Sequence, residues 1–324
     1  MNDIEVLDIN DNDNIDNSNN DINNNTILNR YGEDLLKEEY ITNPAIAREE
    51  EIKKMILALI IPEKSAILVG KPGVGKTALV EGLAYRIQRK EVPDVLKNFS
   101  IIKINITSLI GSTTQEGNVD TKIQTLINEL KNKTNIILFV DEIHNLIGSN
   151  SNSSLDFANM LKAGLDRGTL KIIGATTTEE FDRYLVKDRA FLRRFEKIEV
   201  EEPSPETTVK ILMESLPRIE HKTGAKFDYS NFVAESVIKF MVNMTSEYKR
   251  IFEATSKYPD ITFALLTKAF SFALFDNSNK VTFKHIYDAV TTFDKLYPDV
   301  LVKEKNAFQK EFAKYLEEEK VPLN

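Results

Sequence analysis

Residues 65–77 read SAILVGKPGVGKT, an apolar run followed by a glycine-rich turn and a lysine–threonine pair. Ser65 to Val69 has the apolar composition of a buried parallel strand, and Thr77 to Arg89 has the spacing of an amphipathic helix. Between them, residues 70–77 match G-x-x-x-x-G-K-[ST], the phosphate-binding P-loop. The motif needs a strand before it and a helix after it, so its context favours a functional P-loop over a glycine-rich turn with a helix cap.

The P-loop residues have separate roles toward a nucleoside triphosphate. Glycines let the backbone curl close to the phosphates with its N–H groups pointing inward, and the helix N-terminus adds a positive partial charge. Lys76 would reach the β- and γ-phosphates, and Thr77 would bind Mg²⁺. The residues predicted to contact nucleotide here are Gly70, Lys71, Pro72, Gly73, Val74, Gly75, Lys76, Thr77 and Ala78.

A second motif, IILFVDE at residues 136–142, describes a buried strand that ends in two carboxylates. Ligands of open α/β sheets bind at the carboxyl ends of the strands. Asp141 is placed to hold Mg²⁺, and Glu142 to polarise a water for attack on the γ-phosphate. Two adjacent acids can also be plain surface charge, but after a P-loop they predict a Walker B site. We therefore expect an ATPase with ATP and Mg²⁺ as its cofactors.

Composition bounds the class of protein. The hydrophobic share is 42% of 324 residues, which supports a sizeable core and about two domains plus tails. No apolar run approaches the roughly 18–20 residues of a membrane span, and the N-terminus lacks the pattern of a secretory signal. The chain has no cysteine, which excludes disulfides and thiolate chemistry. We expect a cytoplasmic protein without a membrane partner, and the net charge of −8 argues against nucleic acid.

The chain divides into four parts by pattern. Residues 1–30 are rich in Asn and Asp and are expected to be a disordered tail. In 31–203, predicted strands alternate with predicted helices, which indicates an α/β fold: a parallel five-stranded sheet between helices. The predicted strands are 65–69, 100–106, 136–140, 170–175 and 196–200. The predicted helices are 48–59, 76–90, 119–131, 154–166 and 178–194. After Pro203 and Pro205 the pattern is all helical (206–221, 229–245, 259–275, 282–293), so 204–295 is predicted to be a smaller helical domain. Residues 296–324 are expected to hold one charged helix, at about 303–319.

Six stretches of the chain resemble the first ATPase module of the Clp class of AAA+ unfoldases and disaggregases. They are YGEDL (31–35), NPAIAREEEI (43–52), GKPGVGKTALVEGLAYRI (70–87), ILFVDEIHNLIG (137–148), LDFANMLKAGLDRGTLKIIGATTTEEF (155–181) and DRAFLRRFEKIEVEEPSPETTVKIL (188–212). The resemblance is strong over 31–219 and fades by about residue 273. It implies a AAA+ fold, ATP hydrolysis and assembly into a homohexameric ring.

The resemblance also implies roles for single residues. Thr177 matches the sensor-1 position near the γ-phosphate, and Arg193 and Arg194 match paired arginines that reach the neighbouring subunit's nucleotide. Without the resemblance, those arginines would be a basic helix terminus favoured by the helix dipole. Ala45 and Ile46, after Pro44, match the segment that packs against adenine. At residue 47 this chain has alanine where the family has glycine.

The chain departs from the family at three further places. Gln115 and Glu116 replace an aromatic and a basic residue of the loop that grips substrate in the central pore, and a glutamine lacks the broad apolar face of an aromatic grip. Pro259-Asp260 is kept but Ile261 replaces a lysine, and no sensor-2 arginine can be assigned. The second ATPase module of the family has no counterpart, so we expect no docking on a Clp protease.

Three functions fit these observations. The first is a ring-forming, Clp-like ATPase, a chaperone that remodels an unknown protein partner. The second is a switch whose nucleotide state controls assembly on a partner or nucleic acid without threading of polypeptide, which the changed pore loop favours. The third is a scaffold that binds nucleotide and hydrolyses little. The presence of Lys76, Asp141, Glu142 and the two arginines disfavours this third reading.

Overall fold

The structure is a computed structural model that describes residues 26–105, 108, 119–131, 133, 135–147, 170–252 and 256–323. The expectations for most of the Asn/Asp-rich tail, for the loop at Gln115 and Glu116 and for a helix at 154–166 lie outside these residues.

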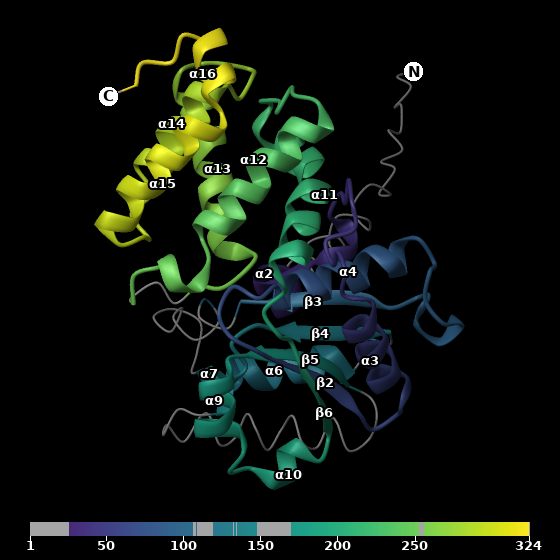
Figure 1. Ribbon diagram of the computed structural model, residues 1–324. Coiled ribbons are helices and arrows are strands. Elements are labelled where there is room, and N and C mark those ends of the chain that lie inside the picture. The colour runs from purple at the N-terminus through teal and green to yellow at the C-terminus, as the bar shows by residue number, and fades with distance from the viewer. Residues whose placement is uncertain are drawn as a thin grey trace, which may run out of the picture.

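The chain is arranged in two parts, as Figure 1 shows. A sheet flanked by helices runs from α2 (Ile27–Tyr31) to β6 (Phe195–Glu199), and we call it the sheet domain. A bundle of helices runs from α11 (Pro205–Thr223) to α16 (Ala313–Glu318), and we call it the helical domain. The bundle lies to one side of the sheet domain, above it in the view.

The sheet has six strands in the order β1-β3-β4-β5-β2-β6. The strands are β1 (Gly32–Asp34), β2 (Ser65–Val69), β3 (Ser100–Ile104), β4 (Ile136–Val140), β5 (Lys171–Thr176) and β6. The five strands expected from the sequence are confirmed and are mutually parallel. The expected strand count was wrong by one, because β1 adds a short antiparallel edge strand along β3. Three residues at an edge carry no periodicity, so only the pairing with β3 reveals this strand.

The central strands are buried on both faces, which explains their continuous apolar runs. One apolar cluster that includes Ile67, Leu138 and Ile172 fills one face, and another that includes Leu68, Phe139 and Ile173 fills the other. In the register, Val69 lies beside Thr176 and Val140 beside Gly174. The residues that follow β2, β4 and β5 therefore meet at a single edge of the sheet.

Helices cover the sheet largely where the sequence predicts them. They are α3 (Glu49–Ile60), α4 (Lys76–Gln88), α6 (Val119–Lys131) and α7 (His144–Ile147), with 3-10 turns η1 (Leu35–Lys37) and η2 (Asp94–Leu96). The single helix expected at 178–194 was wrong. The segment forms α9 (Thr178–Glu180), a π-helical turn η3 (Phe181–Leu185) and α10 (Arg189–Leu192). The Asp188 side chain accepts a hydrogen bond from Phe191 N and starts α10 afresh, which interrupts the longer helix.

The helical domain is a bundle with its own apolar core. Its elements are α11, α12 (Asn231–Met244), η4 (Glu247–Lys249), α13 (Asp260–Phe275), α14 (Phe283–Thr291), α15 (Pro298–Glu311) and α16. Ser204 and Ser230 cap α11 and α12 through their side chains. No helix that the structure describes is long and apolar enough to span a membrane.

The C-terminal helix expected at 303–319 is split in two at Phe312, where α15 ends and α16 begins. These two helices bury rings against α12 and α14. The resulting aromatic cluster contains Phe240, Phe283, Tyr287, Phe308, Phe312 and Tyr315. Phe283 and Tyr315 stack with centroids 4.7 Å apart, and Phe308 is fully buried. The charged outer face visible in the sequence thus has an aromatic inner face that joins the core of the helical domain.

Candidate nucleotide site

The P-loop connects β2 to α4 in the conformation that its glycines allow. Gly73 and Gly75 have φ of 80° and 97°, in the left-handed region that side chains disfavour. Gly75 is the N-cap of α4, so the helix N-terminus points its free N–H groups at the loop. The N–H of Gly70 donates to the Thr176 carbonyl (3.3 Å), which ties the start of the loop to the end of β5.

Lys76 lies over the loop with its ammonium directed at backbone carbonyls. Nζ donates to the carbonyls of Gly70 (2.8 Å) and Lys71 (3.0 Å). Burial lowers the pKa of Lys76, and the nearby carboxylates of Asp141, Glu180 and Glu142 oppose that shift. The cation therefore lies among acids at the sheet edge, within the loop that a triphosphate would occupy.

Thr77 and Asp141 come together from the two motifs. The Thr77 hydroxyl donates to Asp141 Oδ2 across 3.3 Å, although the residues are 64 positions apart in the chain. A hydroxyl beside a carboxylate suits Mg²⁺, which takes one or two protein oxygens and completes its shell with water and phosphate oxygens. Thr77 and Asp141 would hold that ion, and the charge it supplies would neutralise the phosphates.

Glu142 has an unusual backbone conformation. Its φ is 51°, and its N–H donates to Asp141 Oδ1 (3.0 Å). Its carboxylate is exposed at the sheet edge, and Oε2 accepts a hydrogen bond from the Asn145 side chain (3.1 Å). A non-glycine residue in the left-handed region costs of order 1–3 kcal/mol and persists where the surrounding structure imposes it. The turn thus fixes the direction of the carboxylate that the sequence assigns to water activation.

Thr177 follows β5 and caps α9. Its hydroxyl donates to Glu180 Oε2 (2.7 Å) and accepts from Glu180 N (3.2 Å), which is a reciprocal capping box. The residue lies beside the P-loop because Thr176, its neighbour, pairs with Val69. Its place at the end of β5 is the one expected for it.

Ala45 and Ile46, the residues expected against adenine, are buried beside α4. A Cβ added to Gly82 would lie 2.2 Å from the Ala45 Cβ, so two small residues allow the segment to approach the helix. Ala47 has a φ of 55°. The position where this chain departs from the family's glycine is therefore one whose backbone favours glycine.

Arg193 and Arg194 are not brought to this site. The carbonyl of Arg194 accepts from Ser65 N, the first residue of β2, whereas the P-loop follows the last residue of that strand. Five residues of strand span roughly 16 Å. In Figure 1, α10, which precedes the two arginines, lies at the end of the molecule away from the helical domain. The two arginines thus lie at the opposite edge of the sheet from the P-loop.

Sequence reasoning missed Arg48, a buried arginine that supports the P-loop from behind. Its Nη2 donates to the carbonyls of Val74 and Glu201, each at 2.9 Å, and its Nη1 pairs with Glu51 (2.8 Å). It lies within the 43–52 stretch that resembles the family, but no role was expected for it. Its only signal is an arginine directly before three glutamates at a helix start.

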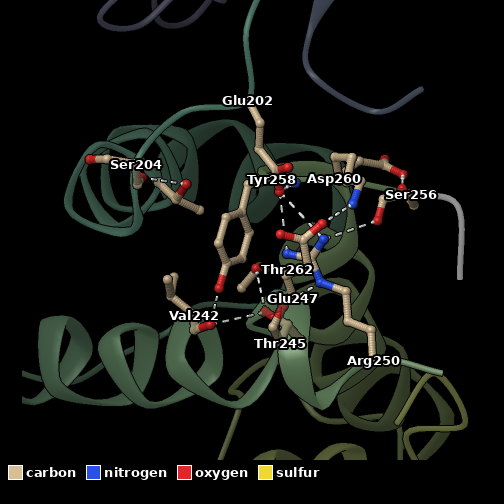
Figure 2. Close-up of polar contacts among 12 residues, drawn as sticks. Glu202, Ser204, Val242, Thr245, Glu247, Arg250, Ser256, Tyr258, Asp260 and Thr262 are labelled. Atoms are coloured by element: carbon tan, nitrogen blue, oxygen red, sulfur yellow. Dashed lines mark hydrogen bonds and ion pairs between the residues drawn. The ribbon is translucent and has the colours of Figure 1, made fainter. Parts of the chain in front are cut away.

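Sequence reasoning also missed Arg250, which joins the two domains. Figure 2 shows its guanidinium between Glu202 and the backbone of the following loop. It donates to Glu202 Oε1 (3.4 Å) and to the Thr245 carbonyl (2.6 Å), and it lies 4.5 Å from the centre of the Tyr258 ring. Glu202 also accepts from Tyr258 N at 2.9 Å. The sequence offered no signal beyond the position of Glu202 at the predicted domain boundary.

The same loop contacts the P-loop directly. Lys257 N donates to the Pro72 carbonyl (3.3 Å), and Asp260 N donates to the Gly73 carbonyl (3.4 Å). A Cβ on Gly73 would lie 2.8 Å from the Asp260 Cβ. A salt bridge between Arg218 and Glu81 (3.9 Å) adds a second contact, from α11 to α4. The start of α13 is therefore packed against the phosphate-binding turn.

Comparison with known proteins identifies the class that this fold and site define. Residues 66–202 match the family described as "ATPase family associated with various cellular activities (AAA)". Together with the P-loop, the Walker B pair and the ClpB relatives described next, this match shows a Clp-class AAA+ ATPase module.

The relatives that it resembles include ClpB chaperones and Hsp104. The chain is 40% identical to the chaperone protein ClpB of Aquifex aeolicus over 225 residues, which are 68% of this chain and 22% of that protein. It is 45% identical to ClpB of Malacoplasma penetrans over 193 residues, 57% of this chain and 27% of that protein. The structure of the S. cerevisiae Hsp104–ADP complex superposes with a TM-score of 0.69 at 30% identity, over 90% of this chain and 49% of that one. The chain thus spans about a quarter of the length of these ClpB relatives.

Proposed function

We propose that this protein binds ATP with Mg²⁺, hydrolyses it, and uses the cycle as a ring of identical subunits to remodel a protein partner, as a chaperone of the cytoplasm. The observation that carries the ATPase proposal is the meeting of the two motifs at one sheet edge. Thr77 Oγ1 and Asp141 Oδ2 lie 3.3 Å apart, with Lys76 and Glu142 beside them. The ClpB relatives are chaperones, which supports the remodelling role.

The residues divide the chemistry between them. Lys76 and the P-loop N–H groups would neutralise and orient the phosphates, while Thr77 and Asp141 would hold Mg²⁺. Glu142 would accept a hydrogen bond from the attacking water and take its proton as the γ-phosphate is displaced. Phosphoryl transfer needs mainly positioning and charge stabilisation, and rigid strand ends provide both.

The ring proposal is supported by the place of Arg193 and Arg194. An arginine at the opposite edge of the sheet cannot reach its own P-loop, yet it can reach that of another copy. Contacts between two different faces of identical chains are heterologous and close into a ring when the rotation permits. We propose a hexamer, in which each site takes an arginine from its neighbour.

Calorimetric titration with ATP tests the nucleotide site. A charge-assisted contact is worth roughly 1.5–3 kcal/mol, so Lys76→Ala should weaken ATP binding at least about tenfold. Lys53→Ala, on the exposed side of α3, is the matched control and should bind as the unaltered chain does. Unchanged affinity in Lys76→Ala would overturn the P-loop assignment.

Mixing two inactive variants tests the shared site. Arg194→Ala subunits retain Glu142, and Glu142→Gln subunits retain both arginines. A mixture should recover part of the turnover, because some interfaces then pair an intact base with an intact arginine. If the mixture stays as inactive as its parents while light scattering shows mixed rings, the arginine does not act between subunits.

Gln115 and Glu116 favour the second candidate, a nucleotide-dependent switch that threads no polypeptide. The two functions differ in what stimulates turnover. Because solved Hsp104 structures include casein complexes, casein is a suitable probe. ATPase stimulation by casein with loss of casein structure supports remodelling, whereas turnover that is indifferent to casein supports the switch.

A further inference from the structure

A buried histidine lies between the two strand ends that build the site. His144 starts α7, three residues after Asp141, and is 8% exposed. Its Nδ1 lies 3.1 Å from Thr176 Oγ1 and 3.2 Å from Glu180 Oε2, and its ring stacks on Tyr184 with centroids 6.1 Å apart. The side chain therefore connects the turn after β4 to the end of β5.

Glu180 is the acceptor on which this connection converges. Its Oε2 accepts from Thr177 N (3.2 Å), from the Thr177 hydroxyl (2.7 Å) and from the more distant Thr176 hydroxyl (3.4 Å), in addition to the His144 ring. Burial raises the pKa of Glu180, but the hydrogen bonds from Thr177 outweigh it and the net shift is downward. The carboxylate is therefore ionised and only accepts, so in this contact Nδ1 carries the proton.

The arrangement decides how Thr177 can act. Its hydroxyl proton is committed to Glu180, and one lone pair is committed to Glu180 N. A hydroxyl has one proton and two lone pairs, so Thr177 retains only an acceptor site. Toward the reacting groups it can accept a hydrogen bond from water but cannot donate one to a phosphate oxygen.

We propose that His144 is a positioning residue for hydrolysis. Through Glu180, its side chain fixes Thr177 as a hydrogen-bond acceptor for the attacking water. It also holds Thr177 in a fixed position relative to the Asp141–Glu142 turn. The inference rests on the proposed ATPase function. Ile143, the residue between Glu142 and His144, also ties the two strand ends, because its N–H donates to the Ala175 carbonyl (3.0 Å). We call this connection between the ends of β4 and β5 the brace. Its backbone part is the Ile143–Ala175 hydrogen bond, and its side-chain part is His144 with Glu180. Only the side-chain part can be removed by substitution.

Steady-state ATPase kinetics of His144→Ala and His144→Asn test the brace. Displacing a positioned group by about 1 Å can cost on the order of 10²-fold in rate, so His144→Ala should lower kcat by roughly 10- to 100-fold with KM nearly unchanged. The side-chain amide of asparagine can place its nitrogen close to the position of Nδ1, so His144→Asn should recover most of kcat. His285→Asn is the matched control, because His285 is also buried and beside a carboxylate, Asp276 at 3.4 Å, but lies in the helical domain. It should leave kcat unchanged.

Amide hydrogen exchange gives a second measurement that does not depend on turnover. The amides of Thr177 and Glu180 both donate within the capping box, so His144→Ala should speed their exchange at least about tenfold relative to amides of β2. An unchanged kcat, or unchanged exchange at both amides, in a folded His144→Ala variant overturns the inference. A kcat lost equally in His144→Ala and His144→Asn, with the capping box intact, also overturns it. Absence of turnover in the unaltered chain would instead overturn the proposed function, and exchange would still decide whether the brace exists.

Discussion

The sheet domain and the helical domain differ in the kinds of side chain that they bury and in where their charged groups lie. In the sheet domain, aliphatic side chains fill both faces of the sheet and charged groups gather at the ends of three parallel strands. In the helical domain, aromatic rings from α12, α14, α15 and α16 form the aromatic cluster within a single core. The difference shows that charged groups gather in one domain and that aromatic packing joins the helices of the other.

The junction of the domains belongs to neither pattern. It is made of hydrogen bonds and ion pairs around Glu202, Arg250 and Tyr258 (Figure 2), together with backbone contacts to the P-loop. Polar contacts can be exchanged for others at little net free energy, whereas interlocked side chains cannot. The candidate nucleotide site, the apolar core of the helical domain and the junction are therefore made of three separate sets of residues, and each set can be altered by itself.

The largest effect is expected from Glu142→Gln, which removes the base and nothing structural. Turnover should fall by roughly 10²–10⁴-fold, while ATP affinity stays within a few-fold, because the proposed role of Glu142 is toward the attacking water and not toward the nucleotide. Thermal unfolding should be nearly unchanged. Normal turnover in this variant would place the base elsewhere and remove the chemistry from this sheet edge.

The next substitution, Phe308→Ala, alters the helical domain and not the candidate site, because it removes a fully buried ring. It should destabilise that domain by about 3–5 kcal/mol in urea denaturation, because the lost contacts leave a cavity. Phe232→Ala is the control: Phe232 is 78% exposed on α12, so its loss should change stability by less than about 0.5 kcal/mol. A small effect of Phe308→Ala would show that α15 is not part of the core.

At the junction, Arg250→Met should cost about 1–3 kcal/mol, because it removes the side-chain donor to the Thr245 carbonyl and leaves the Glu202 carboxylate with the Tyr258 N–H but without its cation. Glu202 is partly exposed and can recruit water, which keeps the expected value below that of a fully buried pair. A double-mutant cycle with Glu202→Gln measures the coupling. Additive effects would mean that the two side chains act independently and that the junction depends on its backbone contacts.

The smallest effect is expected at Ala47, whose φ of 55° suits glycine. Relief of the left-handed conformation, worth about 1–2 kcal/mol, is offset by the greater unfolded-state entropy of glycine, about 0.5–1 kcal/mol. Ala47→Gly should therefore raise stability by no more than about 1.5 kcal/mol. Ala45→Gly, at a buried position without positive φ, should lower it, and a loss of the same size in both variants would contradict the conformational argument.

The sequence predicted most of this fold, because its signals are local and repeated. Buried parallel strands read as continuous apolar runs, and the limits of β2 and β4 were predicted as observed. The breaks at Asp188 and Phe312 were missed: Asp188 starts a new helix through one side-chain hydrogen bond, and Phe312 is buried in the core of the helical domain where α15 ends. The strand β1 was missed because three residues gain their structure from pairing alone.

The candidate site was predictable only in part, and for a related reason. Lys76, Thr77 and Asp141 are found from motif spacing, because phosphate and metal binding restrict residue type and position. Arg48, His144 and Arg250 act on other protein groups, and such contacts can be made from many positions. Their partners Val74, Glu180 and Glu202 are far away in the chain, so no local pattern marks them.

Gly73 packs closely against Asp260, the first residue of α13. If the P-loop turn moved, α13 would therefore rotate about that contact. A helix of 16 residues is about 24 Å long, so a rotation of about 5° at Asp260 would carry its far end by roughly 2 Å. Residues of α13 and α14 share the core of the helical domain, so α14 would move with that end of the helix. A small movement of Gly73 would thus be magnified in the second domain.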